Sequence, residues 1–299
     1  MLKICVIGAA GMISSYLIPN LVNGSIFPDK KIILSLLDIN AEFPINQMKA
    51  TIAELEDCNF KNLESVSYST NSDEAFKNCD LIIFLGGFPR KQGMERSELL
   101  KINGKIFSNQ ADSLLYANKN CKLVIIANPC NTNAKILYTK IMKNPKLSEI
   151  INFRNITCLS RLDHNRANSY YKMENKINED KIFIWGNHSK TLFLDSIDKN
   201  VELTNELITK VKERGGEIIK IKGKSSSFSA ANAICDHIRD WCYGNKGIVS
   251  MGVVSEGEYG VSKDLIFSFP VKCKGNWEIE ILKDIELNEE KKVSLVFQL

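Results

Sequence analysis

The feature that most constrains the fold is an alternation between short, continuous apolar runs and longer segments with helical spacing. The apolar runs in the first half are LKICVIG, KIILSLLDI, DLIIFLGG and KLVIIANP. Strands that are apolar along their whole length are buried on both faces, which is typical of parallel strands connected by helices. Right-handed crossovers between such strands give a doubly wound α/β sheet. We therefore predict this architecture for the first half.

The pattern changes after about residue 155. The runs KIFIWGNH, EIIKIKG, IVSMGVVS and LIFSFPVKCKG fit a mixed, partly antiparallel sheet with long helices. No stretch rich in proline or glycine separates the two halves. We expect two closely packed domains, residues 1–155 and residues 156–299.

Composition excludes several classes of protein. The formal net charge is +4 with scattered lysines, which argues against a nucleic-acid surface. No apolar stretch approaches the roughly 18 residues of a membrane span. The nine cysteines include no CxxC pair, and Cys235 and Cys242 fit no common metal spacing. From this cysteine pattern we expect no metal, and reduced thiols in a cytosol. The first apolar run begins at Leu2, so we also expect no targeting peptide.

The first chemical motif is CVIGAAGMISSYL, residues 5–17. Gly8 and Gly11 lie between a strand and a helix, where a phosphate can approach the first backbone N–H groups, including those of Met12 and Ile13. Asp38 follows at the end of the next apolar run, where a carboxylate accepts ribose hydroxyls and repels a 2′-phosphate. A plain glycine turn and a strand-end turn residue are the alternatives. The combination favours NAD over NADP.

The three histidines differ in their surroundings. His237 has apolar neighbours at helical spacing, and His164 stands at an expected helix start, so both are predicted to pack or cap. His188 ends an apolar strand, from which a side chain can enter a cleft. Proton transfer at a hydroxyl needs such a histidine, held in one tautomer by a carboxylate, and Asp163 is the candidate. Arg166 shares the face of Asp163, although a helix salt bridge explains that spacing equally.

The loop FPRKQGMER, residues 88–96, places Arg90, Lys91 and Arg96 directly after a buried strand. A solvated turn is one explanation. The other is a lid, hinged at Gly86 and Gly87, that carries cations onto an anionic substrate.

Eight segments, in this order, resemble the lactate/malate dehydrogenase superfamily and within it the cytosolic malate dehydrogenases: GAAGMI, LLDI, FPRKQGMER, ANPCNTN, SRLDHNRA, WGNHS, SAANAICDHIRD and VSMGVVSEG. The resemblance implies a Rossmann-type doubly wound parallel sheet followed by a mixed α+β substrate domain. It also implies a cytoplasmic homodimer. The implied reaction is NAD-dependent interconversion of malate and oxaloacetate by hydride transfer, a step of the tricarboxylic acid cycle.

Carried over residue by residue, the resemblance implies that His188 accepts the proton, with Asp163 as its partner. Arg166 would clamp the carboxylate beside the reacting carbon. The other implied contacts are those of Arg96 with the carbonyl, Arg90 with the distal carboxylate, Asn128 with the substrate hydroxyl and the cofactor, and Asn103 and Gln110 with the cofactor. A cis Asn128–Pro129 bond is also implied.

The chain departs from the family at Ser14, where Gly or Ala is usual, in a shortened stretch at 189–204, and in a segment after Trp277 that is shorter than the resemblance leads us to expect. These departures spare the positions named above. Two alternatives stay open at this point. One is a dehydrogenase for another 2-hydroxy acid such as lactate, which would differ in what Arg90 contacts. The other is a non-catalytic NAD-binding protein.

Overall fold

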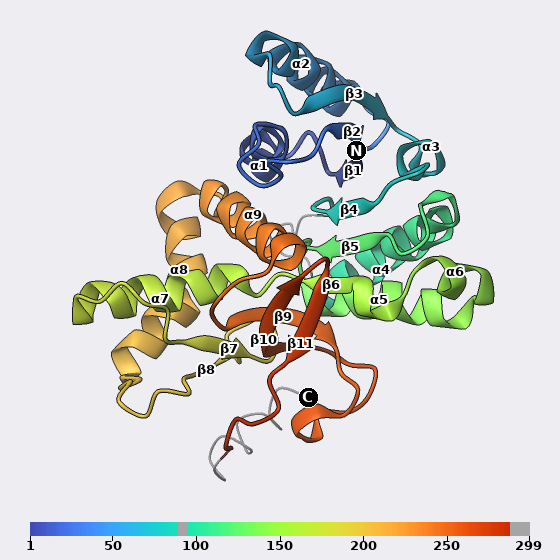
Figure 1. Ribbon diagram of the computed structural model, residues 1–299. Coiled ribbons are helices and arrows are strands. Elements are labelled where there is room, and N and C mark those ends of the chain that lie inside the picture. The colour runs from blue at the N-terminus through green and yellow to red at the C-terminus, as the bar shows by residue number, and fades with distance from the viewer. Residues whose placement is uncertain (89–94, 288–299) are drawn as a thin grey trace. The chain divides into compact units, whose positions relative to one another are not determined.

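The computed structural model describes residues 1–88 and 95–287, and the chain divides into two compact units, Met1–Thr157 and Cys158–Leu299 (Figure 1). Among the described residues, no helix is both long and apolar enough to cross a membrane. Both units contain strands and buried apolar side chains.

The first unit contains a parallel sheet with the strand order β5-β4-β1-β2-β3. Its strands are β1 (Leu2–Ile7), β2 (Ile32–Leu37), β3 (Leu63–Ser69), β4 (Leu81–Phe84) and β5 (Lys122–Ile125). Every residue of β4 is buried, as its unbroken apolar run predicts, whereas β3 at the sheet edge has no buried residue. The strand order reverses between β1 and β4, which is the switch point where open α/β sheets bind ligands. The predicted doubly wound sheet is confirmed.

Helices connect these strands. They are α1 (Met12–Val22), α2 (Glu42–Cys58), α3 (Ser72–Phe76), α4 (Arg96–Ser113), α5 (Cys130–Lys143) and α6 (Pro145–Ile150), with short 3₁₀ turns η1 (Leu114–Tyr116) and η2 (Phe153–Asn155). The helical spacing in α2 buries Met48 and Leu55 on one face. Asn144 caps α6 by accepting a hydrogen bond from the N–H of Lys146, and proline follows at the first helical position. Strand β6 (Ile156–Cys158) contains the boundary between the units.

The second unit is mixed, as predicted. Its elements are α7 (Arg161–Asn175), β7 (Phe183–Trp185), β8 (Phe193–Asp195), α8 (Asn205–Lys222), α9 (Phe228–Tyr243), β9 (Val249–Val254), η3 (Glu258–Gly260), β10 (Ile266–Gly275) and β11 (Glu278–Ile281). Strand β10 pairs antiparallel with both β9 and β11, and β7 and β8 form a separate antiparallel hairpin. The hairpin and the helices α7 and α8 share an apolar cluster that includes Tyr171, Ile184 and Leu207.

The prediction was wrong for EIIKIKG, which forms the last turns of α8 rather than a strand. Helix α8 runs through Gly215 and Gly216 without a break. The alternating isoleucines that resembled a strand leave Ile219 and Ile221 exposed. Gly223, at a φ of 72°, ends the helix in the left-handed conformation.

Candidate active site

The turn after β1 depends on two glycines that approach each other closely. Gly8 has a φ of +78°, and a Cβ at this position would lie 2.6 Å from the backbone of Gly86, which follows β4. Any larger residue would push the ends of these neighbouring strands apart. The backbone N–H of Gly8 donates to the carbonyl of Leu37 at the end of β2, at 2.8 Å.

Ser14, the departure noted in the sequence, supports this turn. Its side chain is buried, and its hydroxyl donates to the carbonyl oxygen of Gly8 at 2.7 Å. The N-cap residue of α1 is Gly11, which has no side chain to cap the helix, and the first turn contains no acidic residue. The amide groups that begin this helix therefore suit a pyrophosphate, whose charge the helix dipole favours. The residues present fit the phosphate end of a dinucleotide.

Asp38 lies directly after β2 and binds the same turn. One carboxylate oxygen accepts the N–H of Ala10 at 2.9 Å, and the other accepts the N–H of Ile39 at 2.8 Å. The residue thus has the turn-forming role given above as an alternative. A carboxylate has about four lone-pair sites, so these two bonds leave acceptor capacity for ribose hydroxyls.

Asn103 and Gln110 both belong to α4. The buried Asn103 side chain accepts the N–H of Phe88 at 2.7 Å and donates to the carbonyl of Phe88 at 3.3 Å, so it anchors the start of the arginine-bearing loop. Gln110 Oε1 is buried, and no hydrogen-bond partner for it lies within the described part of the chain. Asn128, three residues beyond the end of β5 at Ile125, is exposed. The Asn128–Pro129 bond is cis, as predicted.

The second unit brings His188 and Asp163 into direct contact. Asp163 is in the first turn of α7, and His188 lies three residues beyond the end of β7. The distance from His188 Nδ1 to Asp163 Oδ2 is 2.5 Å. The Asp163 side chain is 3% exposed and the His188 side chain 24% exposed, so a buried carboxylate holds a histidine that solvent can reach.

Arg166 completes this cluster from the next turn of α7. Its Nη1 donates to Asp163 Oδ1 at 3.1 Å, and its Nη2 donates to the hydroxyl of Ser226 at 3.1 Å. Each carboxylate oxygen of Asp163 therefore has a different partner. Ser226 precedes α9 in a run of three serines, and nothing in the sequence distinguished it from its neighbours.

The charges of this cluster are coupled. Burial raises the pKa of Asp163, but the charge and hydrogen bond of His188, followed by those of Arg166, outweigh it, and the net pKa is lowered. Burial also lowers the pKa of Arg166, which Asp163 opposes. Asp163 is thus ionised at neutral pH, and it favours the protonated form of the histidine beside it.

The remaining predicted residues are distributed as follows. His164 and His237 are fully buried, on α7 and α9, as predicted for packing residues. Arg90 lies outside the described residues. Arg96 begins α4, but its side chain is not among those the structure describes.

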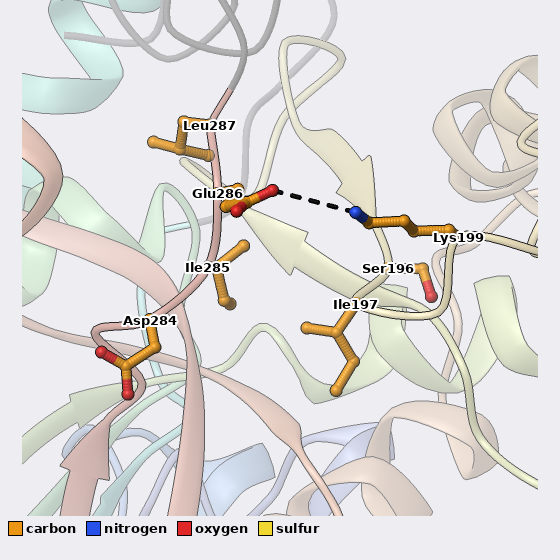
Figure 2. Close-up of a pocket in the computed structure, with 7 residues that line it drawn as sticks. All are labelled: Ser196, Ile197, Lys199, Asp284, Ile285, Glu286 and Leu287. Carbon is orange, nitrogen blue, oxygen red and sulfur yellow. Dashed lines mark ion pairs between the residues drawn. The ribbon is translucent and has the colours of Figure 1, made fainter.

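A pocket in the second unit contains none of the predicted site residues (Figure 2). It is lined by the segment after β8, including Ile197 and Lys199, and by residues 284–287. An ion pair of 4.0 Å joins Lys199 to Glu286, and both side chains are more than 90% exposed. An exposed pair of this kind contributes little free energy, and we assign the pocket no part in catalysis.

Two domain models of known protein families match most of the chain. Residues 2–149 match the lactate/malate dehydrogenase NAD binding domain, and residues 160–296 match the lactate/malate dehydrogenase alpha/beta C-terminal domain. Cytoplasmic malate dehydrogenase 3 of Arabidopsis thaliana is 40% identical over 93% of this chain and 87% of its own length.

Two solved structures have the same fold over nearly the full length. A malate dehydrogenase from Naegleria fowleri superposes with a TM-score of 0.90 at 34% identity, covering 99% of this chain and 94% of that one. A Trichomonas vaginalis lactate dehydrogenase, in complex with NADH and oxamate, superposes with a TM-score of 0.89 at 26% identity, covering 100% and 95%.

Proposed function

The chain belongs to the lactate/malate dehydrogenase family, and we propose that it is a cytoplasmic, NAD-dependent dehydrogenase that interconverts malate and oxaloacetate. The observation that carries this proposal is the contact between His188 and the buried Asp163, with Arg166 on the same carboxylate. The name of the Arabidopsis relative supports the substrate and the location. In this proposal, residues 1–155 bind the cofactor and residues 156–299 bind the substrate.

The first unit supplies the cofactor site. Gly8, Gly11 and the amides of Met12 and Ile13 would hold the pyrophosphate, because the N-cap residue Gly11 has no side chain that would compete for these amides. Asp38 would accept the ribose hydroxyls and exclude a 2′-phosphate. The other proposed cofactor residues are Asn103, Gln110 and Asn128. Bound NAD would supply the hydride acceptor for malate oxidation.

His188 is the proposed proton acceptor. With Nδ1–H donated to Asp163, its Nε2 keeps a lone pair that can take the hydroxyl proton of malate. The proton moves from the substrate oxygen to Nε2 as the C–H electrons leave as hydride. Asp163 stabilises the imidazolium that results, and the same proton returns to the oxygen when oxaloacetate is reduced.

Arginines would read the two carboxylates of the substrate. Arg166 uses two N–H groups on Asp163 and Ser226, and its remaining N–H groups can bind the carboxylate beside the reacting carbon. Arg96 would polarise the carbonyl, and Arg90 would bind the distal carboxylate. Asn128 would contact the reacting oxygen.

A homodimer is part of the proposal. Ile219 and Ile221 near the end of α8 and Phe228 at the start of α9 are 50%, 78% and 68% exposed. The homodimer itself is what the resemblance to malate dehydrogenases implies. Light scattering coupled to size-exclusion chromatography measures the mass directly.

One experiment tests the function. NADH oxidation is measured with oxaloacetate, pyruvate and 2-oxoglutarate in parallel, and we expect the highest kcat/KM for oxaloacetate. A preference for pyruvate would instead identify a lactate dehydrogenase, the alternative that the Trichomonas vaginalis relative supports. Absence of turnover with all three would leave a non-catalytic NAD-binding protein.

A further inference from the structure

The strand that leads to His188 is held in an unusual way. The hairpin β7–β8 pairs only three residues on each side, and His188 lies beyond its end. Short two-stranded hairpins are marginally stable on their own. Something else must fix this segment, because the contact between His188 and Asp163 requires that it stay in place.

Two buried serine hydroxyls bind the backbone of Ile184, the central residue of β7. The N–H of Ile184 donates to Ser250 Oγ at 2.8 Å, and its carbonyl accepts the hydroxyl of Ser268 at 2.9 Å. Ser250 belongs to β9 and Ser268 to β10, and both side chains are fully buried. Two residues further along the chain, Gly186 and Ser268 exchange a pair of backbone hydrogen bonds.

Helix α7 binds the same segment through Asn168. The carboxamide oxygen of Asn168 accepts the N–H groups of Lys181 and Ile182 at 2.8 and 2.9 Å. Its amide nitrogen donates to the carbonyls of Ile182 and His164 at 2.7 and 3.0 Å. The side chain is 2% exposed and makes all four of these bonds.

A second connection to α7 runs through His164. Its Nδ1 lies 3.2 Å from Ser250 Oγ, the atom that also accepts the N–H of Ile184. A hydroxyl that accepts one bond can donate its own proton, which places a lone pair on Nδ1 and the ring proton on Nε2. Nε2 points toward Asp180, 3.6 Å away.

Beside the apolar packing, three polar connections among the described residues join α7 to residues 181–188: Asn168 with the start of the segment, His164 through Ser250 with its middle, and Asp163 with His188 at its end. We propose that Asn168 and the His164–Ser250 pair are positioning residues that set the contact between Asp163 and His188. This inference rests on the proposed function for its catalytic meaning, but its geometry does not.

The test measures the histidine ring directly in the enzyme without substrate. Only three histidines exist, and two are fully buried, so a ¹³C-labelled sample gives one accessible ring, which His188→Asn identifies. In Asn168→Ala, we expect the titration midpoint of His188 to fall by about one pH unit as Asp163 loses contact. Turnover should fall about tenfold in kcat, with the KM for NADH unchanged.

The matched control is Asn175→Ala. Asn175 is on the same helix, and its side-chain Nδ2 donates a hydrogen bond to the carbonyl of Tyr171 in that helix. This variant should keep the wild-type midpoint. A folded Asn168→Ala protein with the wild-type midpoint overturns the proposal. If that variant does not fold, Ser250→Ala replaces it under the same criterion. A lowered midpoint in a chain without malate turnover retains this inference and rejects the proposed function.

Discussion

Replacing Asp163 by Asn tests the proposed mechanism most directly. The change keeps the shape of the side chain but removes the charge that pairs with His188 and Arg166. The site is buried, and removing one partner of a buried ion pair costs about 3–5 kcal/mol. At about 1.4 kcal/mol for each factor of ten, Asp163→Asn should lower kcat/KM for oxaloacetate by roughly 10² to 10⁴. The affinity for NADH, bound by the other unit, should not change.

A second buried ion pair provides the control. Arg161 Nη1 lies 2.6 Å from Asp240 Oδ2, and neither side chain is more than 11% exposed. Asp240→Asn should destabilise the fold comparably but leave kcat/KM near the wild-type value. The assays are NADH oxidation, fluorescence titration of NADH, and thermal unfolding for both variants. If Asp163→Asn and Asp240→Asn lose activity in parallel, the loss reflects stability, and the role assigned to Asp163 is wrong.

The effect of Asp163→Asn on the free energy of unfolding should depend on pH. Because the pKa of Asp163 is lowered in the folded state, its ionised form contributes stability above the ordinary carboxyl pKa, and this contribution is lost as the pH falls through the folded value. The difference in unfolding free energy between wild type and Asp163→Asn should therefore be largest near neutrality and shrink in acid. Denaturant titrations at several pH values measure it. A difference that grows in acid would contradict the sign.

Three further predictions concern single residues. His188→Asn should abolish turnover while NADH binding, followed by fluorescence, stays nearly intact; lost NADH affinity would contradict its assignment. Asp38→Ser should raise the NADP/NAD ratio of kcat/KM, and it should also cost about 1 kcal/mol of stability because the N–H of Ala10 loses its acceptor. Arg90→Gln should lower kcat/KM for oxaloacetate by roughly 10² to 10⁴ while pyruvate activity holds or rises. A parallel fall for both substrates would mean that Arg90 supports the loop instead.

Sequence patterns predicted the strands that are buried over most of their length. Continuous apolar runs identified β1, β2, β4 and β5, because a strand covered on both faces has no polar alternation to conceal it. Strand β3, LESVSYS, lies at the edge of the sheet with no buried residue, and its composition gave no comparable signal. The run EIIKIKG misled in the opposite direction, because its alternating isoleucines resemble a strand although they belong to α8, where Ile219 and Ile221 are exposed.

The sequence predicted some residues of the candidate site and missed others. His188 was predictable because the chain has only three histidines, and this one follows an apolar strand. Asp163 was predictable as an acid at an expected helix start, and the structure places it against His188. Ser226 was not, because three adjacent serines are equivalent until the fold places one of them 3.1 Å from Arg166. Serine and asparagine are common in turns and on surfaces, so their presence carries little information about tertiary contacts.

The two units therefore constrain their sites through different parts of the chain. In the first unit the turn after β1 is set mainly by backbone contacts. Gly8 and Gly86 approach closely because neither has a side chain, and the Ser14 hydroxyl adds one hydrogen bond to the carbonyl of Gly8. In the second unit the hairpin β7–β8 has only three residue pairs, which is too short to fix the segment that leads to His188. Buried polar side chains therefore hold it to α7, β9 and β10. Each of these side chains satisfies backbone groups that would otherwise be buried without partners, and replacing one leaves those groups unsatisfied. Substitutions at Asn168 or Ser250 should thus reach His188 through the backbone, although neither side chain contacts its ring in the described hydrogen bonds.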